Sequence, residues 1–152
     1  MAEVTTSRFT VGVFQDVEWA ARGVEALRGH GFSPESLTII ARDSVEVADL
    51  VRRAMEKDGV KLDIKGLGQS VAAGSLVETL LAGDSGLVNK GLAATMRRAG
   101  FQSHDGLIFE TLIARGGVLV AIDSEPRAAD ALATLHAYGG GNAAIGAWTG
   151  RV

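Results

Sequence analysis

The chain has 152 residues, a formal net charge of −3 and a pI near 5.6, which fit one domain and exclude general electrostatic attraction to nucleic acid. It contains no cysteine, which excludes disulfides, thiolate catalysis and cysteine-ligated zinc. Apolar residues make up 47% of the chain and aromatic residues only 5%, so we expect a single domain over residues 1–152 whose sequence indicates architecture more clearly than chemistry.

The first predicted unit spans residues 8–43 and consists of a strand, a helix and a second strand. An apolar run predicts a buried strand near residues 9–15, and Asp16 is positioned to cap the helix that follows. A second apolar run predicts a strand over residues 37–42, so the unit is βαβ. The helix between the strands carries an apolar stripe at helical spacing, which consists of Ala20, Val24 and Leu27.

Residues 44–116 form a segment too long for a simple connection, and we expect them to fold as a helical insertion. Asp43 and Glu46 have the spacing of a capping box. After Gly59, which ends this predicted helix, the alternating residues 60–64 are compatible with a short edge strand. The apolar stripe of the helix consists of Val47, Leu50, Val51, Ala54 and Met55.

Small residues dominate from Gly66 to Gly100 and predict closely packed helices, one over about 69–82 and one over about 86–99. A third predicted helix, over about 103–114, is apolar around so much of its circumference that it should be mostly buried. The insertion is therefore predicted to be a small helical lobe.

The most apolar window of the chain, residues 71–92, comes nearest to a membrane span. It is interrupted by Glu78, Asp84 and Lys90, and each such charge at the centre of a bilayer costs about 2.5–3.5 kcal/mol. The N-terminal residues also lack the basic and apolar regions of a signal peptide. We therefore expect no membrane span and a cytoplasmic location.

The second predicted unit, residues 117–149, repeats the first, because residues 9–31 align with residues 117–139 without a gap. The repeat predicts strands near 117–123 and 142–148 around a second helix. Two βαβ units predict an α+β, ferredoxin-like split βαβ sandwich of four antiparallel strands with two helices on one face. The helical insertion then lies between strands two and three. Aligned pairs include Val11 with Leu119, Val24 with Leu132 and Gly31 with Gly139.

Three stretches carry a family resemblance: Thr10-Val11-Gly12-Val13-Phe14, the helix end from Val24 to Glu35, and the stretch from Glu110 to Ala121. With these stretches the chain resembles the bacterial general-stress, heat-induced stress protein family. The resemblance implies a strand, a helix and a turn, then a Gly/Ala-rich middle and a helix that runs into a further strand. It offers no catalytic residues. For the function we expect a non-enzymatic, stress-associated protein that acts through self-association or a protein partner.

The residues that could carry chemistry do not form a recognisable catalytic or metal site. His104, Asp105 and Glu110 are the group with metal-ligand chemistry, but on a helix they do not share one face. Glycines over 66–68 and 86–91 lack the patterns of phosphate-binding loops. We therefore expect no enzyme activity, no catalytic residue, no cofactor and no metal.

Two pairs of residues are candidates for binding at the surface. Arg97 and Arg98 lie at a predicted helix end, where they either compensate the helix dipole or hold an anionic ligand. Trp19 and Trp148 are candidate interface anchors, because tryptophan is enriched where proteins bind one another. Either tryptophan could instead pack within one subunit.

Residues 118–122 are apolar at every position, so this predicted strand should be buried on both faces of the sheet. The helical lobe can cover the second face within one subunit or between two. We expect a homo-oligomer, most simply a dimer, with the insertion in the interface. The alternative function is a small-molecule sensor that binds in the cleft between the sheet and the helical lobe.

Overall fold

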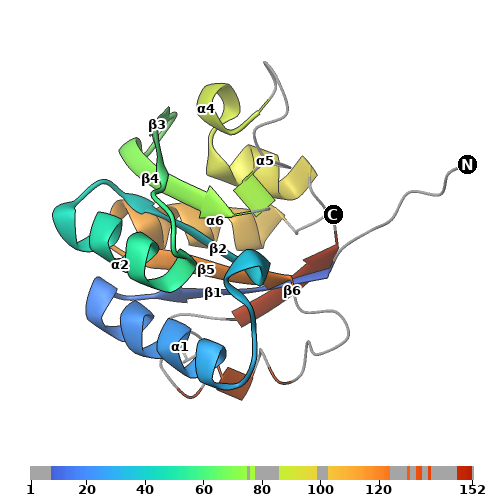
Figure 1. The fold of residues 1–152 in the computed structure, drawn as a ribbon. Helices are drawn as coiled ribbons and strands as arrows, with labels where there is room; N and C mark the ends of the chain where they lie inside the picture. Colours follow the sequence, from blue (N-terminus) through green and yellow to red (C-terminus); the bar gives the residue numbers. More distant parts are fainter. Residues whose placement is uncertain are drawn as a thin grey trace, which may run out of the picture.

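The computed structural model describes residues 8–74, 76–77, 86–98, 103–123, 130, 133–134, 137 and 147–151. Its fold is α+β, with helices packed on one antiparallel sheet (Figure 1). The strands are β1 (Arg8–Phe14), β2 (Leu37–Arg42), β3 (Val60–Ile64), β4 (Gly68–Gly74), β5 (Val118–Asp123) and β6 (Ala147–Arg151). They form a six-stranded sheet in the order β3-β4-β2-β5-β1-β6. The helices are α1 (Val17–Gly29), the 3-10 turn η1 (Pro34–Ser36), α2 (Val45–Met55), α4 (Leu87–Lys90), α5 (Leu92–Arg98) and α6 (Ser103–Ala114).

The first unit folds as predicted, from β1 through α1 and η1 to β2. Asp16 caps α1, because its side chain accepts a hydrogen bond of 2.9 Å from the backbone N–H of Trp19. At the other end, Gly31 has a φ of 94°, a left-handed conformation that glycine adopts at low cost. Both predicted strands and the helix between them are therefore confirmed.

The cap of α2 differs by one residue from the prediction. The side chain of Ser44, and not that of Asp43, accepts a hydrogen bond of 3.1 Å from the backbone N–H of Val47. Asp43 instead lies 3.7 Å from the ammonium of Lys61 in an ion pair. The capping box predicted between Asp43 and Glu46 is therefore wrong, although the helix that it introduced is confirmed.

Alternate residues of the sheet contribute to two separate apolar layers. Helices α1 and α2 cover one face, on which Phe14 and Ile39 are fully buried. Residues of α4, α5 and α6 cover the other face, on which Val13 and Ile40 are fully buried. Because β5 contributes to both layers, it is buried on both faces as predicted. The described part of the insertion covers this second face within the same chain (Figure 1).

The insertion is not purely helical, which corrects the prediction of a helical lobe. Residues predicted to begin a helix over 69–82 form β4, which pairs antiparallel with β2 on one side and β3 on the other. The edge strand predicted at 60–64 is confirmed as β3. Gly74 has a φ of 118° and packs so closely on Leu37 and Thr38 that a Cβ would clash, so small residues here serve close strand packing rather than a helix.

The remaining helices of the insertion follow the prediction in part. The helix predicted over 86–99 is divided at Gly91, where φ is 88° and an added Cβ would lie 2.9 Å from the carbonyl oxygen of Lys65. The helix predicted over 103–114 is confirmed as α6. Its inner residues Phe109 and Ile113 are fully buried, whereas Leu107 is 56% exposed.

The second unit is described at its two strands. β5 confirms the strand predicted near 117–123. The last strand, predicted near 142–148, is described as β6 at Ala147–Arg151, and residues 142–146 lie outside the described residues. In the sheet, β1 lies between β5 and β6. Among the helices of the described residues, none has the length and apolarity that a membrane span requires.

Candidate functional site

The predicted arginine pair lies at the end of α5. Arg97 is exposed, and Arg98 is the last residue of the helix. The side chain of Arg98 lies outside the described residues, so an anion site made by this pair stays a prediction.

The two tryptophans lie on different elements. Trp19 is 37% exposed in the first turns of α1, and its ring centroid lies 5.0 Å from Cζ of Arg22, a cation–π contact within one helix. Trp148 lies in β6, opposite Val11 of β1, and its side chain lies outside the described residues. Trp19 therefore has a local partner, and an interface at either residue stays a prediction.

The predicted metal-ligand group is only partly described. His104 and Asp105 lie in the first turn of α6 with side chains outside the described residues. Glu110 points toward two glycine turns, since its Oε2 would lie 3.0 Å from a Cβ added to Gly66 and 3.3 Å from one added to Gly91. No group of three or more metal-ligating side chains occurs among the residues that the structure describes.

A groove of about 600 Å³ lies between α1 and α2 and is here called the α1–α2 groove. Five apolar residues form its floor, and six charged residues form its rim. The floor consists of Val17, Ala21, Val24, Leu50 and Ala54. The rim consists of Glu18, Arg22, Glu25, Arg28, Glu46 and Arg53.

The topology explains why two helices flank this groove. β1 and β2 both pair antiparallel with β5 and therefore run in the same direction. The helix that follows each strand returns over the same face of the sheet, so α1 and α2 lie side by side (Figure 1). Ala21 and Ala54 are too short to fill the space between them, which leaves the groove open.

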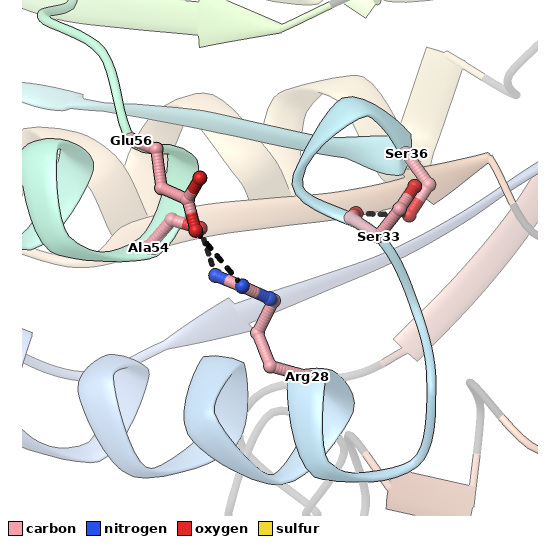
Figure 2. A network of polar contacts seen from close by, with 5 residues as sticks. All are labelled: Arg28, Ser33, Ser36, Ala54 and Glu56. Carbon is pink, nitrogen blue, oxygen red and sulfur yellow. Dashed lines mark hydrogen bonds and ion pairs between the residues drawn. The ribbon is translucent and has the colours of Figure 1, made fainter.

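One arginine joins the two helices at their C-terminal ends. The guanidinium of Arg28 donates a hydrogen bond of 2.8 Å to the carbonyl oxygen of Ala54 and one of 3.1 Å to Oε2 of Glu56 (Figure 2). Its positive charge lies where the C-terminus of α2 carries partial negative charge. Nearby, the hydroxyl of Ser36 donates a hydrogen bond of 2.7 Å to the carbonyl oxygen of Ser33 and closes the η1 turn. These contacts fix one end of the groove.

Among the described residues, some charged side chains of the rim have ion-pair partners and others have none. Arg22 pairs with Glu18 at 3.0 Å, and Arg53 pairs with Asp49 at 3.1 Å, both four residues apart on one helix. Arg28 pairs with Glu56 at 3.1 Å. Glu25 on α1 and Glu46 on α2 have no ion-pair partner within the described residues. The unpaired charge of the rim is therefore acidic.

Sequence reasoning identified both helices but not the groove between them. The apolar stripes of α1 and α2 predict that each helix packs on a sheet, and they do not predict which helices become neighbours. A usable signal is the run of acidic and basic residues at helical spacing from Glu18 to Arg28, because it marks a face that the sheet does not cover.

Comparisons of the chain with protein-family models, with curated proteins and with solved structures found no match. The family resemblance based on the three sequence stretches therefore stays a prediction.

Proposed function

We propose that this chain is a non-enzymatic, cytoplasmic bacterial stress-associated protein that acts by binding a helical segment of a protein partner in the α1–α2 groove. The observation that carries the proposal is the groove, which combines an apolar floor with a rim whose unpaired charges are carboxylates. The stress association is supported by the three stretches that resemble the general-stress family.

A ferredoxin-like core is part of the same proposal. The strands of the two predicted units, taken in chain order, are β1, β2, β5 and β6, and they lie in the order β2-β5-β1-β6. This is the order expected when two βαβ units interleave in one sheet. The second crossover helix is supported only by residues 130, 133, 134 and 137, which are helical. β3 and β4 extend this core beyond β2.

A helix matches the shape of the groove. α1 has 13 residues and α2 has 11, so each offers a wall of roughly 16–20 Å at 1.5 Å per residue. An amphipathic helix that lays its apolar stripe on Val17 and Ala21, the partly exposed residues of the floor, buries that stripe against two neighbouring helices. Lysines or arginines beside its stripe then face Glu25 and Glu46. The partner segment is therefore an amphipathic helix with basic flanks.

Fewer observations on the described residues support the small-molecule alternative, which was predicted to bind in the cleft between the sheet and the helical lobe. At the boundary between the sheet and α4–α6, the side chains of Met96, Phe109 and Ile113 are fully buried against strand residues. A groove of about 600 Å³ is large enough for a metabolite, but it lies on the surface between two helices, whereas ligand pockets enclose most of their ligand. A helix fits this surface better.

The test measures binding of a synthetic helical peptide of about five turns, with a leucine stripe and lysines on both flanks. We expect Glu25→Lys to weaken binding about threefold and Glu25→Lys combined with Glu46→Lys to weaken it roughly tenfold, because exposed ion pairs contribute about 0.2–1 kcal/mol each. Glu35→Lys is the matched control, since Glu35 is exposed in η1 and does not line the groove. Fluorescence anisotropy gives the affinities.

Three results would contradict the proposal. The first is equal binding of a peptide with glutamates in place of the lysines, and the second is equal weakening by Glu35→Lys. The third is a metabolite that shifts the thermal midpoint and displaces the peptide, because a ligand stabilises the folded state by RT ln(1 + [L]/Kd). That third result would assign the groove to a small-molecule sensor.

A further inference from the structure

Among the residues that the structure describes, β3 forms an outer edge of the sheet and has no further strand beside it. This strand is the last in the strand order and pairs with β4 on one side. Val60 is 54% exposed, and Lys61 and Asp63 are also exposed. An edge strand presents backbone N–H and C=O groups that another strand can pair with.

The pairing of β4 shows which backbone groups of β3 face outward. The N–H of Asp43, the residue directly after β2, donates a hydrogen bond of 2.9 Å to the carbonyl oxygen of Gln69. The backbone groups of Gln69 therefore point toward β2. Asp63 lies opposite Gln69 in β3, and this pair is therefore not hydrogen-bonded. The N–H and C=O of Asp63 consequently point away from β4, and those of Lys61, two residues earlier, do the same.

Lys65, two residues after Asp63, supports this assignment of the outward-facing backbone groups of β3. The N–H of Lys65 points away from β4 and donates a hydrogen bond of 3.1 Å to the carbonyl oxygen of Val88 in α4. α4 therefore covers the end of the edge, after Ile64. The outward backbone groups of Lys61 and Asp63 remain at its centre.

The sequence of β3, Val60-Lys61-Leu62-Asp63-Ile64, is complementary to itself. We infer that β3 pairs antiparallel with β3 of a second copy of this chain, in a register centred on Leu62. Lys61 then lies opposite the partner's Asp63, and Val60 opposite the partner's Ile64. The arrangement has a two-fold axis, as most homodimers have. It gives a specific surface to the self-association expected from the sequence and does not involve the α1–α2 groove.

Backbone and side chains require the same register. Lys61 and Asp63 carry the outward backbone groups, so each cross-axis pair exchanges both of its N–H···O=C hydrogen bonds. The same pairs place opposite charges directly across from each other, which stabilises antiparallel strands. Within the described chain Asp63 has no ion pair, and Lys61 has only the exposed contact of 3.7 Å with Asp43.

The other face of the strand is apolar. Leu62 and Ile64 belong to the apolar layer covered by α4–α6, with Ile64 fully buried and Leu62 partly exposed. Pairing brings Leu62 against the partner's Leu62 and covers part of the exposed Val60. A lysine on an edge strand usually opposes pairing with other strands. Here a copy of the same strand supplies the matching aspartate, so the edge favours its own copy over unrelated strands.

The first experiment is a disulfide test in this chain, which has no cysteine of its own. Across the axis Leu62 and its copy form a non-hydrogen-bonded pair, with Cα atoms about 4.5 Å apart, a distance that a disulfide spans. Leu62→Cys should therefore give mainly covalent dimer on mild oxidation at micromolar concentration. Val60→Cys is the matched control, because its copy lies about 14 Å away in this register. Equal cross-linking of both variants, or of neither, would overturn the inference.

The second experiment exchanges the charges. Lys61→Asp places two aspartates opposite each other and Asp63→Lys places two lysines, so each single variant should raise the dimer dissociation constant roughly tenfold. The double variant Lys61→Asp, Asp63→Lys restores opposite charges and should return the constant to within about threefold of the original. Sedimentation equilibrium measures the constants, and circular dichroism verifies that each variant is folded.

The two proposals fail in different ways. A wild-type chain that stays monomeric at 100 µM, or a double variant as weak as the single ones, would overturn β3 pairing and leave peptide binding by the α1–α2 groove untouched. The weaker peptide binding expected of Glu25→Lys should in turn leave the dimer constant unchanged. A change of the dimer constant in that variant would contradict the separation of the two surfaces.

Discussion

Arg28 illustrates how one side chain can fix the distance between two helices. It is about one-third exposed, and its guanidinium binds the last turn of α2 through Ala54 and Glu56. Glu56 has a φ of 61°, and a left-handed backbone costs a non-glycine residue roughly 1 kcal/mol. The contact with Arg28 offsets part of that cost and holds α2 beside α1.

We expect Arg28→Ala to lower the free energy of unfolding by about 1 kcal/mol, because it removes a charged hydrogen bond to a partly buried carbonyl as well as an ion pair that solvent screens. Arg22→Ala is the matched control on the same helix. Its partner Glu18 is exposed, so the change should stay within about 0.5 kcal/mol. Urea unfolding followed by circular dichroism measures both values. Equal effects of the two variants would show that Arg28 does not join the helices.

Two glycines of α1 allow a test of how closely this helix packs on β1. A Cβ added to Gly23 would lie 2.8 Å from Cε1 of Phe14, which is fully buried, whereas nothing lies within 4 Å of a Cβ added to Gly29. Gly23→Ala should therefore destabilise by about 1–2 kcal/mol through overpacking. Gly29→Ala should be neutral or stabilising by up to about 1 kcal/mol, because alanine favours helix. Thermal unfolding compares them, and a stabilising Gly23→Ala would contradict this packing.

At the scale of elements, periodicity predicted the structure well where one pattern was unambiguous. The stripes of α1 and α2 and the alternation of β3 led to the correct elements. The run Val71-Ala72-Ala73-Gly74 has no distinct period, because β4 is covered on both faces. A short apolar run of this kind fits a buried strand and a buried helix equally. The strand results from pairing with β2 and β3, which no local pattern contains.

The cap of α2 gives a prediction at this scale. Ser44 accepts the hydrogen bond from Val47, and Asp43 is engaged with Lys61. Ser44→Ala should cost about 1 kcal/mol of stability, because an orphan N–H of the first turn loses its acceptor. Asp43→Ala should cost less than about 0.5 kcal/mol, since its ion pair is exposed. The reverse order of the two effects in urea unfolding would restore the capping box predicted from the sequence.

The candidate surfaces were harder to predict than the fold, and the reason is physical. Cores follow from hydrophobic periodicity, which is local in the sequence. The α1–α2 groove depends on Ala21 and Ala54, which come from different helices and become neighbours only through the sheet order. The self-complementary order of Lys61 and Asp63 is visible in the sequence, but it gains meaning only when β3 is known to lie at an edge.

At the scale of the whole molecule, the insertion is a structural part of the domain. It supplies β3 and β4 to the sheet and the helices that cover the second face. Val13 of β1 and Phe109 of α6 belong to one buried layer, although they are far apart in the sequence. The insertion and the two βαβ units should therefore unfold together in one transition, as small single domains usually do.

This cooperativity can be tested from within the insertion. Phe109→Ala removes a fully buried ring and should cost about 3–5 kcal/mol. Trp19 lies on α1, which covers the opposite face of the sheet. The measurements use a Trp148→Phe background, in which Trp19 is the only tryptophan. If the domain is cooperative, tryptophan fluorescence and far-ultraviolet circular dichroism should shift to the same lower urea midpoint in this variant. Leu107→Ala, at an exposed position of the same helix, should leave both midpoints nearly unchanged. A fluorescence midpoint that stays at the wild-type value while the dichroism changes would mean that α6 unfolds independently of α1, and the insertion would then be a separate lobe.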